Sequence, residues 1–461
     1  MLRNRFRSLS LALGLLILGL APVSVLAGEA APAAADQAPA EHAPAGQTPV
    51  AETSAEAPPA SAAAATVPDA IRERRILQTD PYAAARVDNA PLDPDLKGFF
   101  TLPGTTTMLR FGGNAKVDVI HDFDPAGDPD IFITSTIPVG PTPSSDNTSI
   151  GIGQSRLDFE LRRPLAGKVG GDLRFFCEFN FLGENGATTP DLRHLYGQAM
   201  NILAGFTFST LMDADSLPDT LDFEGPGSMV YMLQPQLRWT KAFGDRTTLA
   251  FAVERGTSDL VTEVPTDPDI VITPTSPWPD GIVRYRYETD RWHLQAGAVL
   301  RSVGGYTSTL VERHVPAGGV SVSGAVQLSG NDTLLWQGNF GQGMGRYVED
   351  MTGLAADVGL DEDGDLVALP VAAGFAALQH SWNEEFRSSF VWGRIDLDSA
   401  GKTLTTSFHT SDYAAANLIW NPKGTPFNVG IEYLYGRQQI ATGEAGDAHR
   451  LQFSFQYDLV N

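Results

Sequence analysis

The sequence predicts an all-β protein that crosses a membrane as an antiparallel, up-and-down β-barrel of about 16 strands. Three observations predict this fold. Apolar and polar residues alternate within segments of about 10 residues. The apolar faces of these segments carry no charge, and the connections between segments alternate in length. Because a soluble sandwich also alternates, the uncharged faces and the connection lengths favour the barrel.

The alternation is already clear in the first segment, residues 108–123. Its apolar face carries Phe111, Gly113, Ala115, Val117 and Val119, and its polar face carries Arg110, Asn114, Lys116 and Asp118. A charge on a lipid-facing position near the middle of the bilayer costs about 2–4 kcal/mol, so the uncharged face suits hydrocarbon. The same scheme predicts strand cores at 108–123, 153–163, 169–182, 192–200, 202–211, 228–241, 247–256, 282–290, 291–302, 319–328, 332–341, 373–382, 385–397, 408–420, 425–437 and 449–459.

The strand at 385–397 is less regular than the others. Arg387 and Arg394 fall on opposite phases of the alternation. We therefore expect either a β-bulge between them or an arginine that lies beyond the lipid.

The connections predict the orientation of the barrel, because outer-membrane barrels have short periplasmic turns and long external loops. The short connections are at 164–168, 243–246, 289–290, 329–332, 383–384 and 421–424. The long connections are at 124–153, 211–227, 256–281, 302–318, 342–372 and 438–448.

The N-terminal part of the chain predicts export. Arg3, Arg5 and Arg7 precede an apolar stretch at 9–20, and small residues end at Ala27, so residues 1–27 are expected to be a signal peptide. Residues 28–100 are rich in Ala and Pro and are expected to be a largely disordered periplasmic segment, in which 71–78 can form a short helix. The barrel then covers 101–461, and the cell outer membrane is the expected location.

Composition excludes several function classes. The net charge of −23 would repel nucleic acid, and a single cysteine, Cys177, excludes an intrachain disulfide and a cysteine-based metal cluster. The eight histidines have no metal-ligand spacing. The acidic run 361–365 lacks the distal bidentate glutamate of a calcium-binding EF-hand loop. We therefore expect no metal, no cofactor and no catalytic residues.

The loop after the fifth strand has an unusual composition for a solvent-exposed loop. It combines apolar Leu217, Leu221 and Phe223 with five carboxylates: Asp213, Asp215, Asp219, Asp222 and Glu224. We expect this third external loop to fold into the lumen and to narrow it. The cations on the inward phase of the strands would face the loop and bind solute, because a planar guanidinium group can form two hydrogen bonds with one carboxylate. These cations are Lys116, Arg156, Arg174, Arg238, Arg284 and Arg286. The open alternative is that these cations pair with inward carboxylates such as Asp158, Glu160 and Glu288.

Several stretches resemble the DcaP-like porins. They are Leu102-Pro-Gly-Thr-Thr-Thr-Met-Leu-Arg-Phe-Gly-Gly-Asn-Ala-Lys-Val-Asp118, Leu192-Arg-His-Leu-Tyr-Gly-Gln198, Gly205-Phe-Thr-Phe-Ser-Thr-Leu-Met-Asp213, Leu217-Pro-Asp-Thr-Leu-Asp-Phe-Glu-Gly-Pro226 and Arg450-Leu-Gln-Phe-Ser454. The resemblance implies a homotrimeric outer-membrane channel that takes up small organic anions such as dicarboxylates. Its partners would be outer-membrane lipid, the solutes and the outer-membrane assembly machinery.

Three functions stay open on the sequence. The first is a channel for passive or weakly selective diffusion of small hydrophilic solutes. The second is a barrel enzyme of the lipase or protease type, for which serine and histidine lie near each other at His380-Ser381 and at 409–411. The third is a structural barrel with a plugged lumen. Solute flux without hydrolysis would indicate the first.

Overall fold

A computed structural model describes residues 98–141, 146–165, 172–183, 186–264, 267–308, 311–399, 402 and 406–459. All of them belong to one unit, residues 66–461. The predicted signal peptide, the predicted helix at 71–78 and the rest of the segment up to residue 97 lie outside the described residues.

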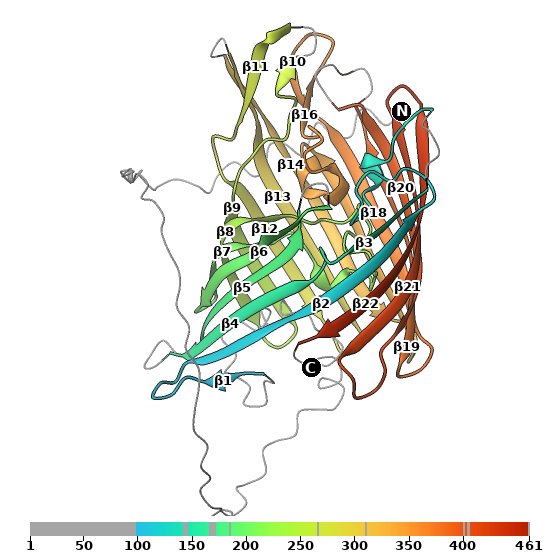
Figure 1. Ribbon diagram of the computed structural model, residues 1–461. Helices are drawn as coiled ribbons and strands as arrows, with labels where there is room; N and C mark the ends of the chain where they lie inside the picture. Colours follow the sequence, from blue (N-terminus) through green and yellow to red (C-terminus); the bar gives the residue numbers. More distant parts are fainter. Residues whose placement is uncertain are drawn as a thin grey trace, which may run out of the picture. The chain divides into compact units, whose positions relative to one another are not determined.

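Sixteen of the described strands form a closed antiparallel ring, as the sequence predicts (Figure 1). Each strand pairs with its neighbour along the chain, and the last strand closes the ring by pairing with the first, Asn114 to Asp458 and Asp122 to Arg450. The ring consists of β2 (Met108–Asp122), β4 (Arg156–Pro164), β5 (Asp172–Leu182), β6 (Thr188–Ala199), β7 (Ile202–Phe208), β8 (Leu233–Phe243), β9 (Thr247–Glu254), β12 (Asp280–Glu288), β13 (Trp292–Thr307), β14 (Glu312–Gln327), β15 (Asp332–Gln342), β18 (Pro370–Ser381), β19 (Phe386–Leu397), β20 (Phe408–Trp420), β21 (Phe427–Ile440) and β22 (Ala445–Asp458).

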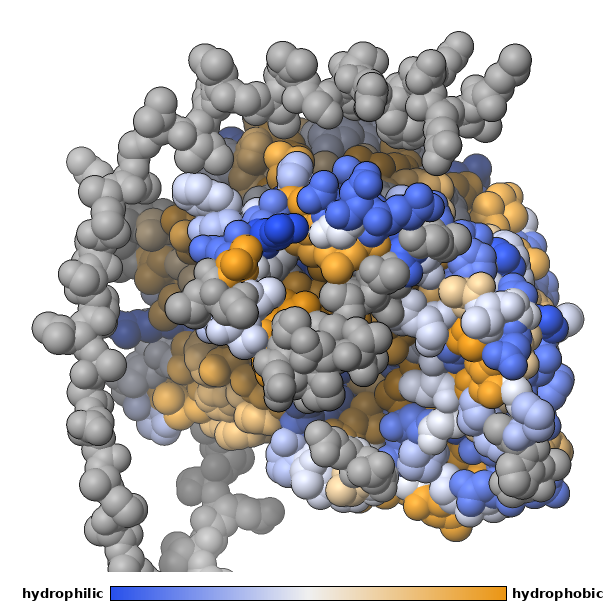
Figure 2. All heavy atoms as spheres, turned by 90° about the horizontal axis from the view of Figure 1, so that it is seen from above, coloured by the Kyte–Doolittle hydropathy of each residue, from blue (hydrophilic) through white to orange (hydrophobic). Residues whose placement is uncertain are grey.

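The alternation of the sequence separates an apolar outer face from a polar inner face. On β2 the outward Phe111 is 60% exposed, whereas the inward Lys116 is 7% exposed. Outward Leu237 and Phe251, on β8 and β9, are also about half exposed. An exposed apolar wall around a polar interior is the arrangement that a bilayer requires. Figure 2 looks down on the end of the ring that carries the long loops, where hydrophilic residues are numerous.

Short turns join the strands at one end of the ring and the longer connections lie at the other end (Figure 1). Two predicted long loops are wrong. The one at 302–318 is mostly strand, because β13 continues to Thr307 and β14 begins at Glu312. The one at 438–448 is a tight connection between Ile440 and Ala445. These strands extend beyond the segment in which lipid-facing and lumen-facing residues alternate. The sequence of their outer ends therefore does not show the alternation of apolar and polar residues that marks the membrane-spanning parts.

The expected irregularity of β19 takes the form of two differently placed arginines, not a bulge. The pairing of β19 with β18 is continuous from Arg387 to Leu397. Arg387 points inward to Asp219. Arg394 points outward and pairs with Asp412, 2.8 Å away, with 44% of its side chain exposed.

Shorter elements lie in the connections. They are β1 (Phe100–Thr101), β3 (Asn147–Gly151), β10 (Glu263–Val264), β11 (Asp267–Thr275), β16 (Val358–Leu360), β17 (Leu366–Ala368) and the 3₁₀ turns η2 (Thr134–Thr136), η4 (Ala214–Ser216), η5 (Gly345–Tyr347) and η6 (Glu349–Met351). β3 pairs with the second half of β2, residues 118–122, and β4 pairs with its first half, residues 108–114. Among the described residues, no helix is both long and apolar enough for a membrane span.

Described parts of three external connections pack against the inner wall: L1 (residues 123–141 and 146–155), L3 (209–232) and L6 (343–369). Leu211 and Met212 of L3 join Tyr347 and Met351 of L6 in one buried apolar cluster with wall residues. Phe132 of L1 belongs to a second cluster. The interior of the ring therefore contains both polar wall residues and folded loops.

Candidate functional site

The outgoing limb of L3 is fixed to β12, β13 and β14 through one carboxylate. Asp213 accepts hydrogen bonds from Arg286 at 2.8 Å, His293 at 2.9 Å and Ser323 at 2.7 Å. Burial alone would raise the pKa of Asp213, but Arg286 and the hydrogen bonds from His293 and Ser323 outweigh it and lower the pKa well below its usual range. Asp213 therefore stays ionised and holds L3 near the wall.

The tip of L3 lies against the opposite side of the ring. Glu432 of β21 accepts the backbone N–H groups of Leu221 and Asp222, at 3.1 and 2.8 Å. The Leu221 carbonyl accepts from Lys116 of β2 at 2.6 Å and from Gln452 of β22 at 3.2 Å. Because these strands lie across the ring from β12, L3 spans the lumen.

An aromatic residue of L3 lies between two guanidinium groups. The Phe223 ring is 4.2 Å from the guanidinium carbon of Arg156 on β4 and 4.5 Å from that of Arg193 on β6. The register of β5 and β6 shifts between Glu178 and Phe179, which inserts Arg193 as an extra residue. The bulge lets Arg193 enter the lumen beside His194, the next residue of β6.

The returning limb of L3 pairs with L6. Val230 and Val348 form an antiparallel bridge, and the Tyr231 N–H donates to the Tyr347 carbonyl at 3.1 Å. The Glu349 N–H donates to the Met229 carbonyl, also at 3.1 Å. L3 and L6 are thus joined by backbone hydrogen bonds inside the ring.

L6 is held to the wall by a buried ion-pair network. Arg301 of β13 contacts Asp280 of β12 and Asp357 of L6, each at 3.0 Å, and all three side chains are 0% exposed. The Tyr347 hydroxyl donates to Asp280 at 2.8 Å. A buried guanidinium between two carboxylates is compensated only while all three groups are present.

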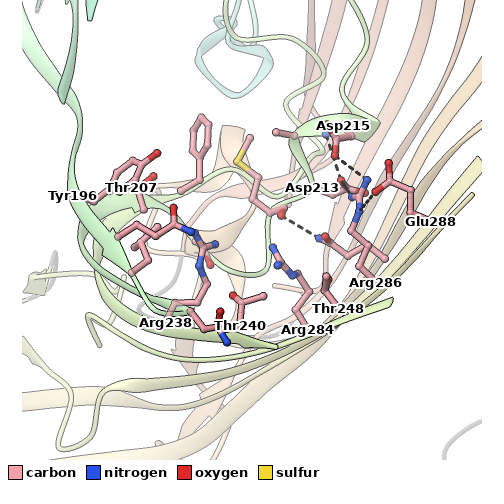
Figure 3. A pocket seen from close by; sticks show the side chains of 18 of the residues that line it. Tyr196, Thr207, Asp213, Asp215, Arg238, Thr240, Thr248, Arg284, Arg286 and Glu288 are labelled. Atoms are coloured by element: carbon pink, nitrogen blue, oxygen red, sulfur yellow. Dashed lines mark hydrogen bonds and ion pairs between the residues drawn. The ribbon is translucent and has the colours of Figure 1, made fainter. Parts of the chain in front are cut away.

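A cavity of about 170 Å³ lies between the outgoing limb of L3 and the wall of β6–β9, β12 and β13. Four arginines and four carboxylates line it: Arg238, Arg246, Arg284 and Arg286, and Asp213, Asp215, Asp245 and Glu288. In Figure 3, Arg286 lies among its three carboxylate partners, and Arg238 and Arg284 point toward the space beside this group. Phe208, Met212 and Leu203 give the same cavity an apolar side.

The structure divides the predicted site residues into two groups. Five of them line the cavity: Asp213, Asp215, Arg238, Arg284 and Arg286. The other six do not: Lys116, Arg156, Arg174, Asp219, Asp222 and Glu224. Lys116 and Arg156 contact L3, and Asp219 pairs with Arg387. Arg174 pairs with Glu160 of the wall at 2.7 Å, as the alternative interpretation expected for such arginines.

Sequence reasoning missed L6, Arg193, Arg301 and Glu432. For L6 the signal was present, because 344–351 contains Met344, Tyr347, Val348 and Met351, the same apolar content that singled out L3. No periodicity predicts that a bulge turns Arg193 inward.

We expect Glu432→Ala to release the tip of L3. The change leaves two buried backbone N–H groups without their acceptor, at a cost of about 1–3 kcal/mol each. The measurement is the open-channel current noise in planar bilayers, which should increase. Glu432→Gln is the matched control, because its amide oxygen still accepts from Leu221 and Asp222. Equal noise in both variants would contradict the anchoring role.

The residues considered for hydrolysis have other partners. His380 bonds to Asp332 at 2.7 Å, and His409 bonds to the Leu397 carbonyl at 2.8 Å. Across the part of the chain that the structure describes, no three His, Cys, Asp or Glu side chains are placed to hold a metal ion.

Comparison with known proteins finds one family and several solved structures to which the chain is similar. A family model described as DcaP outer membrane protein matches residues 101–459. The crystal structure of the outer membrane channel DcaP of Acinetobacter baumannii is similar, with 18% identity, a TM-score of 0.68, and coverage of 79% of this chain and 100% of that one. OmpT of Vibrio cholerae has 12% identity, a TM-score of 0.48, and coverage of 78% and 100%. The anion-selective porin from Comamonas acidovorans has 8% identity, a TM-score of 0.48, and coverage of 77% and 100%. No curated protein sequence matches the chain.

Proposed function

Because the chain belongs to the DcaP outer membrane protein family, we propose that it lets small organic anions, such as dicarboxylates, cross the outer membrane by passive or weakly selective diffusion. Its place as an outer-membrane channel of the porin type follows from the family and the closed barrel. The choice of solute is the proposal.

The observation that carries the proposal is the charge arrangement of the lumen cavity. Guanidinium groups of Arg238 and Arg284 lie on the wall opposite the L3 limb, whose Asp213 and Asp215 are already bound to Arg286. Separated charges of opposite sign create a transverse field that orients a dipolar solute. Planar guanidinium forks match carboxylates, so an organic anion has suitable donors on one side of the path.

The proposal involves no chemical step and no cofactor, so the chain is not expected to be an enzyme. It includes a homotrimer in outer-membrane lipid, inserted by the outer-membrane assembly machinery, with the N-terminal segment in the periplasm.

Swelling of liposomes that contain the purified protein tests the proposal. Mono- and dicarboxylates should enter faster than neutral sugars or amino acids of similar size, because their net negative charge is attracted to Arg238 and Arg284, whereas sugars are uncharged and neutral amino acids have no net charge. A panel in which sugars enter as fast as dicarboxylates would contradict the choice of solute.

A plugged structural barrel is the second candidate, because L1, L3 and L6 all pack inside the ring. Zero conductance in planar bilayers, with the protein folded and inserted, would favour it.

A further inference from the structure

Four carboxyl groups lie in the region where L1, L3 and L6 come together. Asp222 and Glu224 belong to L3, and Glu349 and Asp350 belong to L6. Asp222, Glu224 and Asp350 are 1, 8 and 2% exposed. This carboxyl junction takes no part in the lumen cavity described above.

Backbone and side-chain contacts bring the three loops together at the junction. The Asp350 N–H donates to the Gly227 carbonyl of L3 at 3.0 Å. The Asp350 carboxyl accepts from the Thr134 N–H of L1 at 2.8 Å and also from the Thr134 hydroxyl. Gly227 is required here, because a Cβ at that position would overlap the Asp350 carboxyl group. Glu349 lies beside Asp350 on L6, and its N–H donates to the Met229 carbonyl of L3 at 3.1 Å.

Carboxylates that are buried together repel one another and have no donor, so a carboxyl group in this junction favours its protonated form, which can donate. Burial, followed by the neighbouring Glu349, raises the pKa of Glu224 well above its usual range. Burial, followed by Asp350, does the same for the pKa of Glu349. Burial also raises the pKa of Asp222 and the pKa of Asp350, each to about 6.

The charged and titratable groups around the junction do not supply matching positive charge. Arg193 is the cation that acts on Glu349, while Lys116 and Arg450 act on Asp222. Tyr413 faces the junction from β20 with 2% exposure, and its hydroxyl has no hydrogen-bond partner among the described residues. The full set comprises Asp222, Glu224 and Tyr231 of L3, Glu349 and Asp350 of L6, Lys116 and Asp118 of β2, Arg156 of β4, Arg193 of β6, Tyr413 of β20, Glu432 of β21 and Arg450 of β22.

A bound metal ion could also balance the charge, but the described carboxyl groups do not converge in threes as a metal site would need. Protons are therefore the counter-charge that the geometry supports.

We propose that the carboxyl junction is a proton-held latch, which keeps L6 docked on L3 and the lumen narrow, and which opens when its protons leave. The inference goes beyond the choice of solute and needs only that the chain is a channel.

The direction of the pH effect follows from linkage. A carboxyl group whose pKa is raised in the docked state stabilises that state below its ordinary pKa, and the contribution is lost as the pH rises through the raised pKa. The docked state is thus favoured in acid. It weakens as the pH rises through and above about 6, where Asp222 and Asp350 also ionise.

Single-channel conductance in planar bilayers, measured from about pH 5 to about pH 9, tests the latch. We expect the wild-type conductance to increase about twofold or more over this range, as the loop population shifts from docked to released. Glu224→Gln and Glu349→Gln should each keep a lower conductance than wild type at high pH and respond less to pH, because an amide donates without a proton to lose. Glu362→Gln, at an exposed position of L6, is the matched control and should behave as wild type.

A reversible cross-link tests whether the loops move. Val230 and Val348 pair directly, and the Cα spacing of such a pair suits a disulfide. In a Cys177→Ser background, Val230→Cys with Val348→Cys should lose the conductance increase when oxidised and regain it when reduced. Different gel migration of unboiled and boiled protein shows that each variant is folded.

Three outcomes would overturn the latch. They are a pH-independent wild type, glutamine variants with the wild-type response, and a full response in the oxidised cross-linked protein. A response abolished by a divalent-metal chelator would assign the junction to a cation instead and would also overturn the proposal. None of these outcomes depends on whether dicarboxylates enter liposomes faster than sugars do. The latch and the proposed function are therefore tested separately.

Discussion

Replacing both Arg238 and Arg284 by glutamine should lower the ratio of anion to cation permeability about tenfold, which corresponds to about 1.4 kcal/mol. Both side chains line the lumen cavity, and their removal leaves its carboxylates in excess. A field that now favours cations should slow organic anions most strongly. The measurement is the zero-current potential across a bilayer with a salt gradient, together with dicarboxylate entry into liposomes.

Arg313→Gln is the control for this prediction. Arg313 lies at the outer end of β14 with 58% of its side chain exposed, so it changes net charge without changing the cavity. If both proteins keep the wild-type permeability ratio, the cavity arginines do not determine selectivity.

The second large effect is expected from Arg301→Ala. The change leaves Asp357 buried without its cation and Asp280 with only Arg346, 3.5 Å away, and breaking a buried ion pair from one side costs about 3–5 kcal/mol. Because Asp357 belongs to L6, we expect L6 to leave the wall. Urea unfolding in lipid vesicles should show the loss of stability, and protease should cut within 343–369.

Arg394→Ala is the matched control, because Arg394 and Asp412 form an exposed pair on the outer face. An exposed ion pair contributes about 0–1 kcal/mol, so this variant should retain the wild-type midpoint and an intact L6. A similar midpoint for both variants would contradict the role assigned to Arg301.

The ring could be predicted from the sequence because lipid imposes a simple rule on each strand. Every second residue between Phe111 and Val119 must suit hydrocarbon, and the same constraint recurs around the closed wall. The predicted core 408–420 coincides with β20, and 202–211 begins at the same residue as β7. The rule ends at the membrane surface, which is why the outer ends of β13 and β14 were predicted as loop.

The interior was only partly predictable, because contacts across the lumen join residues far apart in the sequence. The composition of L3 singled out Asp213, and inward phase singled out Arg286; the structure brings the two within 2.8 Å. Inward phase could not distinguish Arg284, which lines the cavity, from Arg174, which pairs with Glu160. The contact between L3 and L6 depends on backbone pairing at Val230 and Val348, for which the sequence has no local signal.

The zero-current potential of the wild-type protein under a potassium chloride gradient tests the central claim most directly. The account predicts the sign of an anion-selective channel, because Arg238, Arg284 and Arg286 line the lumen cavity. A potential of the opposite sign would show that the acidic residues of the lumen govern the passage, and would contradict the account.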